Sequence, residues 1–396
     1  MTSEVKRVPE LRFPEFSGEW EEDKLRDLLE DNVILEQSDG NHGELYPKSS
    51  EFTEDGIPYL AASNISNNSI SYQNIKYLPL ERAKQFKKGV ARDGDILLAH
   101  NATVGPSTLL ITDFPFVILS TTLTLYRINK VKMDNHFFLN EIRSNNVQNQ
   151  LKKLMKQTTR NQVPILLQRT MHISYPKILA EQQKIGEFFS KLDRQIELEE
   201  QKLAKLEEQK KGYMQKIFSQ ELRFKDNNGE EYPKWESKKL EEVAIINTGK
   251  SKIVNEENAA YSNLGSTGVL GKSSHYEYDG NFILTARVGH YAGKLYNFSG
   301  KANISDNTIF LETDLNLNFT LNMLNNYNLK RIAFGSGQPL IKSSELKKLI
   351  FNIPCGEEEQ KIGGFLSGFD SLIGKQSHKI ELLKECKKGF LQKMFV

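Results

Sequence analysis

Two stretches of this chain decide its fold: EQQKIGEFFSKLDRQIELEEQKLAKLEEQKKGYMQKIF (residues 181–218) and EEQKIGGFLSGFDSLIGKQSHKIELLKECKKGFLQKMF (residues 358–395). They align without a gap at an offset of 177 residues, and 18 of the 38 positions are identical. Chance does not explain this agreement. The chain therefore contains a duplicated element, and the fold must accommodate two copies of it.

Within each copy, apolar residues alternate at spacings of three and four, the a/d pattern of a coiled coil. No proline interrupts either copy. The pattern predicts two helices of roughly 57 Å each, at 1.5 Å per residue, which pair antiparallel within the chain. Two unrelated surface helices are the alternative. The residues expected to line the helix pair or dock a partner on it are Ile185, Phe188, Leu192, Ile196, Leu203, Leu206, Tyr213, Ile362, Phe365, Phe369, Ile373, Ile380, Leu383 and Phe390.

Each copy also places a lysine and another polar residue inside the apolar pattern, which suggests a register for the pair. One register brings Glu199 opposite Lys387. The same register brings Lys210 opposite Gln376, so that polar residues meet each other. Such pairs fix register at some cost in stability. A slide of one heptad satisfies the apolar pattern equally well, so the register is a hypothesis.

A second, shorter repeat precedes each variable stretch. Glu-Leu-Arg-Phe stands at 10–13 and again at 221–224, and the chain's two tryptophans, Trp20 and Trp235, follow these copies. The variable stretches share fainter echoes, such as DGDILLA (93–99) and DGNFILT (279–285), each followed by a Val-Gly pair. The chain thus divides into a first block (residues 1–178), a helix (179–219), a second block (220–356) and a second helix (357–396).

Both blocks are expected to contain strands and helices. The segments IPYLAASNI (57–65), DILLA (95–99), STTLTLYRI (120–128) and FILTARV (282–288) predict strands, separated by polar loops. Similar apolar spacing at 137–144 and 319–326 predicts one helix in each block. The predicted fold class is α+β: two mixed α/β blocks in tandem, separated and followed by long helices that form an antiparallel coiled coil.

Composition excludes several classes of protein. The 53 Lys+Arg and 51 Asp+Glu residues give a net charge of +2, which excludes a histone-like protein but not a local basic surface. Mean hydropathy is −0.52, and no run of apolar residues is long enough to span a membrane. The first residues contain no apolar signal core. The two cysteines, Cys355 and Cys386, suit a reducing compartment, so a cytoplasmic protein is expected.

No motif in the sequence carries catalytic chemistry. LGSTGVLGKS (264–273) resembles a phosphate-binding loop, but Ser266 stands where that motif needs glycine, so a turn-rich loop is favoured. FGSGQP (334–339) has no βαβ unit around it, and no Asp/Asn-Pro-Pro-aromatic motif for amino methylation occurs. The seven histidines show no metal-binding spacing. No catalytic residue, metal ligand or bound cofactor is therefore expected in this chain.

The remaining candidate chemistry is binding by loop residues. Arg, Asn and Gln read base edges through paired hydrogen bonds, while Lys, Ser and Thr contact phosphates. In the first block the candidates for DNA contact are Arg92, His100, Asn101, Thr103, Arg160, Asn161 and Gln162. In the second block they are Lys250, Lys252, Arg287, His290, Lys294, Arg331, Ser336 and Gln338. For each residue alone, a solvated loop position is at least as good an interpretation.

With two variable blocks, each followed by an EQ-K-I-G helix, the chain resembles the specificity (S) subunit of Type I restriction–modification systems. The resemblance covers nearly the whole chain, including the Leu-Arg-Phe…Trp openings. The neighbourhoods of Gln162 and Gln338 resemble the family's Gly/Thr-rich loop, although Thr-Thr-Arg-Asn-Gln departs from Gly-Ser-Gly-Gln. The resemblance implies that the blocks are target recognition domains, each of which binds half of a bipartite sequence in double-stranded DNA.

The resemblance also implies partners. The helices would act as a spacer between the half-sites and dock two methyltransferase (modification) subunits, which would carry S-adenosylmethionine and methylate adenine. Restriction subunits would add ATP- and Mg-dependent translocation and cleavage. This chain would then be a non-catalytic subunit without a membrane segment. A structural adaptor with two non-DNA binding modules on a helical stalk is the first alternative, and a free-standing methyltransferase or nuclease is the second.

Overall fold

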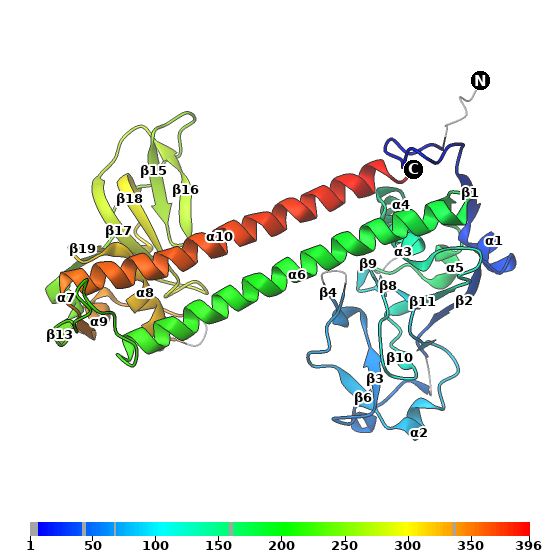
Figure 1. The fold of residues 1–396 in the computed structure, drawn as a ribbon, viewed down its shortest axis with the longest axis horizontal. Helices are drawn as coiled ribbons and strands as arrows, with labels where there is room; N and C mark the ends of the chain where they lie inside the picture. Colours follow the sequence, from blue (N-terminus) through cyan, green and yellow to red (C-terminus); the bar gives the residue numbers. More distant parts are fainter. Residues whose placement is uncertain (1–6, 42–44, 67–68, 158–160, 336–337) are drawn as a thin grey trace. The chain divides into compact units, whose positions relative to one another are not determined.

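The computed structural model describes residues 7–41, 45–66, 69–157, 161–335 and 338–396 (Figure 1). The chain divides into two compact units, unit 1 (Met1–Leu198 with Ile380–Val396) and unit 2 (Glu199–Lys379). Each unit combines one variable block with part of both long helices, α6 (Leu179–Phe218) and α10 (Gly356–Lys393). The mixed α+β architecture with two tandem blocks is as expected from the sequence.

The block of unit 1 contains many short strands and five α-helices in its described part. Its strands are β1 (Glu21–Lys24), β2 (Ile34–Asp39), β3 (Ile57–Leu60), β4 (Ile65–Ser66), β5 (Ser69–Ile70), β6 (Lys76–Leu78), β7 (Val90–Ala91), β8 (Ile96–Asn101), β9 (Thr103–Leu109), β10 (Val117–Leu119), β11 (Leu123–Ile128) and β12 (His172–Tyr175). Its helices are α1 (Leu25–Glu30), α2 (Leu80–Ala83), α3 (Asn135–Arg143), α4 (Asn145–Met155) and α5 (Ile165–Gln168), with 3₁₀ turns at Ser49–Glu51 and Ala62–Asn64.

Two four-stranded sheets form the body of this block. Their strand orders are β6-β3-β10-β7 and β2-β11-β8-β9, and β1 pairs with β12 in a separate two-stranded sheet. A buried apolar cluster that includes Leu60, Leu97 and Leu125 joins the two larger sheets. A second cluster packs α3 and α4 on the other side of β8 and β11, through Leu98, Tyr126, Phe138 and similar residues. The ends of β8 and β9 are therefore held on a rigid double layer.

The block of unit 2 has one larger sheet. Its strands are β13 (Glu236–Lys239), β14 (Ala244–Thr248), β15 (Tyr261–Gly265), β16 (Gly268–Ser273), β17 (Tyr278–Ala286), β18 (Leu295–Ile304), β19 (Thr308–Thr313) and β20 (Ile350–Ile353). Its helices are α7 (Leu240–Val243), α8 (Leu317–Tyr327) and α9 (Ser343–Lys347), with a 3₁₀ turn at Leu329–Ile332. The sheet order is β14-β19-β17-β18-β15-β16, and β13 pairs with β20.

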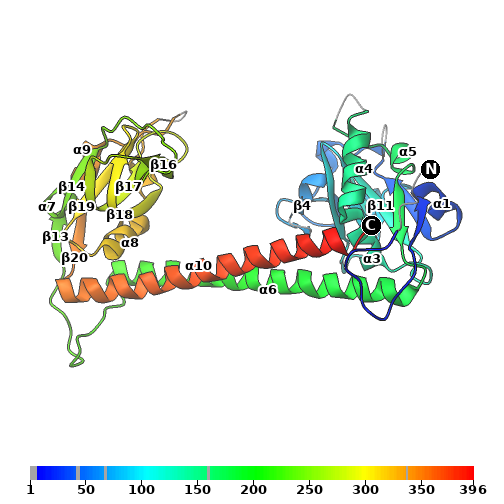
Figure 2. The same cartoon turned by 90° about the horizontal axis from the view of Figure 1, so that it is seen from above.

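In unit 2, α8 lies between the six-stranded sheet and the long helices (Figure 2). One apolar cluster connects these layers, from Ile309 and Leu311 of β19 through Phe319 of α8 to Ile217 and Ile362 of the long helices. The burial of such large side chains contributes roughly 25 cal/mol per Å² of apolar surface. The same helices that form the coiled coil are thus part of the core of the block.

Two of the predicted segments differ from expectation. The segment 57–65 is not one strand, because β3 ends at Leu60, a 3₁₀ turn follows at Ala62–Asn64, and Ile65 begins β4. The Asn64 side chain accepts a hydrogen bond from the Ala61 N–H at 2.9 Å at this turn. Residues 264–273 are not a turn-rich loop but most of the β15–β16 hairpin, in which Tyr261 pairs with Ser273. The other predicted strands and both short helices lie within β8, β11, β17, α3 and α8 or overlap them closely.

The long helices run antiparallel within each unit. In unit 1, Phe188 and Phe390 rings pack at 5.0 Å, and Lys387 of α10 forms an ion pair with Asp193 of α6. In unit 2, Lys210 of α6 pairs with Asp370 of α10 at 2.6 Å. These two ion pairs join equivalent positions, since Lys387 and Asp370 stand 177 residues after Lys210 and Asp193. The duplicated sequence therefore makes the same contact twice with the helices exchanged.

The predicted register of the helix pair is wrong. Glu199 does not meet Lys387 but accepts hydrogen bonds from Gln376 at 2.7 Å and from Lys379 at 2.6 Å, and Lys210 meets Asp370 instead of Gln376. The pattern is shifted by about one heptad, which preserves the apolar seam. The observed register is favoured because it gives both lysines a carboxylate partner.

A buried glutamate explains the start of each repeat. In unit 1, the Arg12 guanidinium donates to both oxygens of Glu181, at 2.7 and 2.8 Å, and the Trp20 N–H donates to the same carboxylate at 3.4 Å. In unit 2, Arg223 and Trp235 bind Glu358 in the same way, at 2.6 to 3.1 Å. Both glutamates have no exposed side-chain surface. We call these two sets of residues the clamps.

The glycine that the two repeats share, Gly186 and Gly363, allows a short helix to approach. A Cβ at Gly186 would collide with the side chain of Asp134, which caps α3 by accepting from the Phe137 N–H at 2.8 Å. A Cβ at Gly363 would collide in the same way with Asn316, which caps α8. The EQ-K-I-G motif thus anchors α3 and α8 against the long helices. This contact fixes the position of each block on the helices of its own unit.

The phenylalanines outside the a/d pattern are covered by the chain itself. The Phe188 ring packs against Phe13 at 6.2 Å, and the Phe365 ring packs against Phe224 at 5.5 Å. Phe13 and Phe224 end the two Leu-Arg-Phe repeats, so the segments before the blocks lie over these rings. These side chains therefore stabilise their own units, which argues against the expectation that they are free to dock a partner.

Candidate nucleic-acid interface

Both blocks bring two distant loops together through the same backbone hydrogen bonds. In unit 1 the Ala102 N–H donates to the Asn161 carbonyl at 2.9 Å, and the Val163 N–H donates to the His100 carbonyl at 2.8 Å. In unit 2 the Gly289 N–H donates to Pro339 at 2.9 Å, and the Ile341 N–H donates to Arg287 at 2.8 Å. We call residues 100–103 with 161–163 loop pair one, and residues 287–294 with 338–342 loop pair two.

The two loop pairs share a special backbone position. Ala102 has φ +64° and Gly289 has φ +87°, so both chains turn through the left-handed region at the same point. That conformation costs an alanine roughly 1–2 kcal/mol. The equivalence also corrects the sequence alignment, because Gly289 matches Ala102 and not the glycine of the Val104-Gly105 pair, which lies in β9.

Loop pair one gathers five of the predicted contact residues. His100, Asn101, Thr103, Asn161 and Gln162 lie together, and Asn101 bridges to Gln162. Thr103 and Asn161 are exposed, and Asn101 and Gln162 are half-buried. Amide and hydroxyl groups of this kind donate and accept hydrogen bonds, which is the chemistry that base edges require.

A buried network of polar side chains supports loop pair one on its inner side. The His100 ring nitrogen Nδ1 shares a hydrogen bond of 2.9 Å with the Thr124 hydroxyl, and Gln168 donates to that hydroxyl at 3.0 Å. Gln168 also donates to the Val163 carbonyl at 2.7 Å and accepts from the Tyr126 hydroxyl at 2.5 Å. Burial raises the pKa of Tyr126, so it stays a donor. His100 thus faces inward and positions the loop, a role that its sequence neighbourhood does not reveal.

Loop pair two gathers cations. Arg287, His290, Lys294 and Gln338 are all exposed on it. Arg331 stands beside it, because the position of a Cβ at Gly293 lies 3.0 Å from the Lys330 backbone nitrogen.

Within the described residues, none of the arginines and lysines in or beside loop pair two has an ion-pair partner. These residues are Arg287, Lys294, Lys330, Arg331 and Lys342, and sequence reasoning missed Lys330 and Lys342. Uncompensated cations on one loop cluster create a positive potential at that surface.

Lys250 and Lys252 extend this basic surface. The Gly249 N–H donates to the Thr308 carbonyl at 2.9 Å, and the Arg287 N–H donates to the Asn307 carbonyl at 2.9 Å. Lys250 and Arg287 thus flank the same turn between β18 and β19. Both lysines are exposed. The second block therefore brings most of its predicted contact residues to one region.

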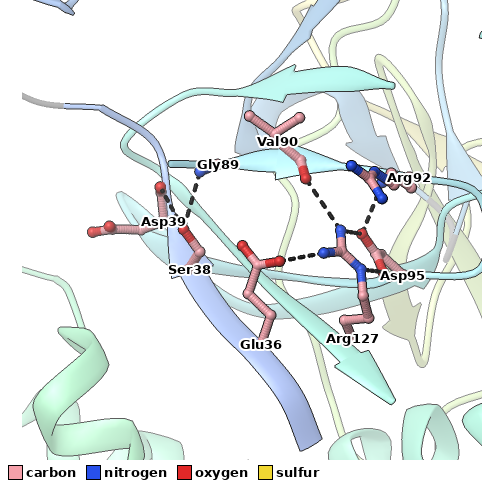
Figure 3. Close-up of polar contacts among 8 residues, drawn as sticks. All are labelled: Glu36, Ser38, Asp39, Gly89, Val90, Arg92, Asp95 and Arg127. Carbon is pink, nitrogen blue, oxygen red and sulfur yellow. Dashed lines mark hydrogen bonds and ion pairs between the residues drawn. The ribbon is translucent and has the colours of Figure 1, made fainter. Parts of the chain in front are cut away.

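Arg92 does not join loop pair one. It lies in the turn before β8, whereas Asn101 ends that strand. The Arg92 N–H donates to Asp95 at 2.8 Å, and Asp95 accepts from Arg127 at 2.7 and 3.0 Å (Figure 3). Burial alone would lower the pKa of Arg127, but its ion pairs with Asp95 and Glu36 raise it. This cluster fixes the turn. Two other predicted residues, Arg160 and Ser336, lie outside the described residues.

In the described part of the chain, no group of three or more His, Cys, Asp or Glu residues is placed to hold a metal ion. Among the same residues, no helix has the length and apolar character needed to cross a membrane.

Comparison with known sequences identifies a family and several relatives. The family described as Type I restriction modification DNA specificity domain matches residues 18–208 and 232–385. The Type I restriction enzyme MjaVIII specificity subunit of Methanocaldococcus jannaschii is 26% identical over 233 residues, which are 57% of this chain and 50% of that protein. The putative MjaX specificity subunit of the same organism is 41% identical over 58 residues, 15% of this chain and 14% of that protein. The match thus spans half or less of these curated relatives.

Solved structures share the fold. The S subunit of a Type I restriction–modification system from M. genitalium superposes with a TM-score of 0.65 at 14% identity, over 98% of this chain and 99% of that one. A chain from work on complex assembly and conformational transition of the type I R-M system gives a TM-score of 0.54 at 17% identity, over 94% and 96%. At these identities the likeness concerns the fold alone.

Proposed function

Because this chain belongs to the family of Type I restriction modification DNA specificity domains, we propose that it selects a bipartite DNA sequence for partner subunits. Each block contributes one loop pair, and each loop pair contacts one half of the target in double-stranded DNA. The match to the curated relatives covers only part of their length, so the activity of the assembled enzyme belongs to this proposal.

The observation that carries the proposal is the repetition of one loop geometry with different side chains. Both loop pairs use the same two backbone hydrogen bonds, yet one carries Asn, Gln and Thr and the other carries Arg, Lys and His. A fixed backbone with variable side chains suits recognition of two different half-sites. A structural adaptor does not require one backbone geometry to be repeated with an amide-rich surface in one block and a basic surface in the other.

The catalytic steps are proposed to lie in partner subunits. Two methyltransferase subunits would supply S-adenosylmethionine and methylate adenine, and restriction subunits would supply ATP- and Mg-dependent cleavage. This chain would hold the DNA and the methyltransferases together, without chemistry of its own. A purified chain that methylates or cleaves DNA alone would contradict this part of the proposal.

The long helices are proposed to set the gap between the half-sites. Deletion of one heptad from each helix, residues 200–206 and 377–383, removes equivalent turns and keeps the a/d pattern. We expect the half-site sequences to stay the same while the number of base pairs between them changes. Methylation mapping in cells reads both properties at once, and an unchanged gap would contradict the spacer role.

Methyltransferase docking is proposed on exposed apolar positions of the helices. Leu382 is 48% exposed on α10, whereas Phe188 packs against its own unit and is unsuitable for a test. We expect Leu382→Asp to reduce co-purification of the methyltransferase. Lys205→Asp, at the equivalent exposed position of α6, is the control for added charge. Equal recovery with both variants would place docking elsewhere.

DNA binding itself is tested by salt dependence. The chain with its methyltransferase partners should lose affinity for duplex DNA steeply as salt rises, because cations on the loops release counterions from phosphates. Binding should also prefer the sequence found by methylation mapping. A complex that binds no duplex, or binds with no salt dependence, would favour the structural adaptor.

A further inference from the structure

Large apolar side chains are exposed on loop pair two and at the neighbouring Phe334, whereas the described part of loop pair one exposes none. Phe334 is 58% exposed, Tyr291 is 51% exposed and Val288 is 38% exposed. The corresponding described surface of loop pair one carries Ala102, Thr103 and Asn161 instead. Val288 and Phe334 both pair with Leu340, and exposed apolar side chains that gather in this way mark an interaction site.

The backbone holds both rings in place. Phe334 and Leu340 exchange two hydrogen bonds, of 2.9 and 2.8 Å, in an antiparallel bridge. Tyr291 stands in a tight turn, where the Ala292 N–H donates to Gly289 at 2.9 Å and the Lys294 N–H donates to the Tyr291 carbonyl at 2.9 Å. The rings are thus attached to an ordered backbone, which lowers the entropy lost when they bind.

Cations surround the two rings. The Lys342 ammonium lies 5.4 Å from the centre of the Phe334 ring, and the Lys294 ammonium lies 5.7 Å from the centre of the Tyr291 ring. Arg287 lies on the same loop pair, and Arg331 lies beside it. An exposed ring can stack on a planar base, and cations without an ion-pair partner can bind phosphates, so the two together fit a nucleic-acid ligand. An apolar protein surface would leave the cations without partners.

We propose that Phe334 and Tyr291 act as a wedge at one base step of the half-site that block two contacts. This inference rests on the proposed function. Phe334 inserts at the step and stacks on a base, Tyr291 supports it, and Lys342 and Lys294 hold the flanking phosphates. The described residues of loop pair one present no exposed ring, so its half-site stays fully stacked. The two half-sites are therefore read differently, one through groove hydrogen bonds and the other through deformation of the duplex.

The test uses the complex with its methyltransferase partners and the bipartite duplex found by methylation mapping, without S-adenosylmethionine. The adenine analogue 2-aminopurine replaces one adenine of either strand at a time outside the methylated positions, because its fluorescence rises when it is unstacked. We expect a several-fold rise at one step of the block-two half-site and none in the block-one half-site. Phe334→Leu should abolish this rise and weaken binding about 10-fold, with the salt slope unchanged.

Two control variants separate stacking from charge. Lys342→Gln should keep the fluorescence rise but reduce the salt slope by about 0.9. Glu54→Gln, an exposed change in block one outside loop pair one, should leave the fluorescence rise unchanged. Because Phe334 is exposed, equal thermal unfolding of wild type and Phe334→Leu is expected, and that measurement verifies folding.

The outcomes distinguish this inference from the proposed function. Salt-dependent binding to the bipartite duplex with no fluorescence rise, and with Phe334→Leu binding like wild type, would overturn the wedge and leave DNA recognition standing. Loss of methyltransferase co-purification with Phe334→Leu, at unchanged DNA fluorescence, would also overturn it and assign the ring to a protein contact. The absence of any duplex binding would overturn the proposed function as well.

Discussion

The two blocks share a frame and differ at the surface that the frame supports. Glu181 and Glu358 are each bound by an Arg and a Trp of their own unit. Gly186 and Gly363 each allow the equivalent short helix, α3 or α8, to approach. On that common frame, loop pair one carries amides that a buried network of polar side chains supports. Loop pair two, with the neighbouring Phe334, carries cations and exposed rings. The comparison shows that the repeated sequence specifies where the loops stand, while the variable sequence specifies what they contact.

The clamps should show the largest effect, and an equal one in both units. Glu181→Ala leaves Arg12 beside a buried site without its carboxylate, and Glu358→Ala does the same to Arg223. Each change should destabilise its own unit by about 3–5 kcal/mol. Hydrogen exchange, read separately for peptides of the two blocks, measures this. A large loss in one unit and none in the other would break the equivalence of the frames.

A buried acid distinguishes the two cores. Glu141 of α3 occupies the position of Met323 in α8, and burial raises the pKa of Glu141 to about 8, although it accepts from the Ser174 N–H at 3.0 Å. Because the folded pKa lies above the usual value of 4.5, the unfolded chain ionises first as pH rises. Unit 1 should therefore lose stability between about pH 4.5 and 8, by about 2–4 kcal/mol.

Glu141→Gln provides the matched variant, since it keeps the acceptor and removes the charge. We expect this variant to abolish the pH dependence of unit 1 and to leave unit 2 unaffected. Hydrogen exchange of the two blocks at pH 5 and pH 7.5, corrected for the intrinsic exchange rate, is the measurement. A wild-type unit 1 that is equally stable at both pH values would contradict a neutral Glu141.

The loop pairs should differ in how salt affects them. Arg287→Ala and Arg331→Ala remove unpaired cations of block two, so each should lower the slope of log affinity against log salt by about 0.9. Asn161→Ala in block one should keep the slope and reduce discrimination between base pairs at its own half-site. Equilibrium titrations at several salt concentrations check both. Similar slopes for all three variants would show that the two surfaces bind alike.

Much of the frame was predictable from sequence because it depends on periodicity and repetition. The a/d pattern predicted the two long helices and their antiparallel pairing. The register was not predictable, because a slide of one heptad preserves the apolar seam and only the polar contacts of Asp193, Glu199 and Asp370 distinguish the alternatives. The clamps were visible as repeats, but Arg12 and Glu181 stand 169 residues apart, so their contact followed only from the fold.

The interface was predictable only in part, for a different reason. Polar loop residues such as Asn101 and Asn161 can be proposed from their type, and the structure brings them together through backbone bonds between distant segments. Phe334 and Tyr291 escaped because an apolar residue in a sequence is first assigned to a core. His100 was expected to face a ligand, but its hydrogen bond to Thr124 turns it inward. Composition alone does not show which side chains a loop exposes.

The central claim is that each loop pair determines one half of a bipartite DNA target. The most direct measurement is methylation mapping in cells that express the methyltransferase partners with wild type, with Asn161→Ala or with Arg287→Ala. The account predicts a two-part motif in which the first variant relaxes one half and the second relaxes the other. A motif in which both variants alter the same half, or in which neither half changes, would contradict it.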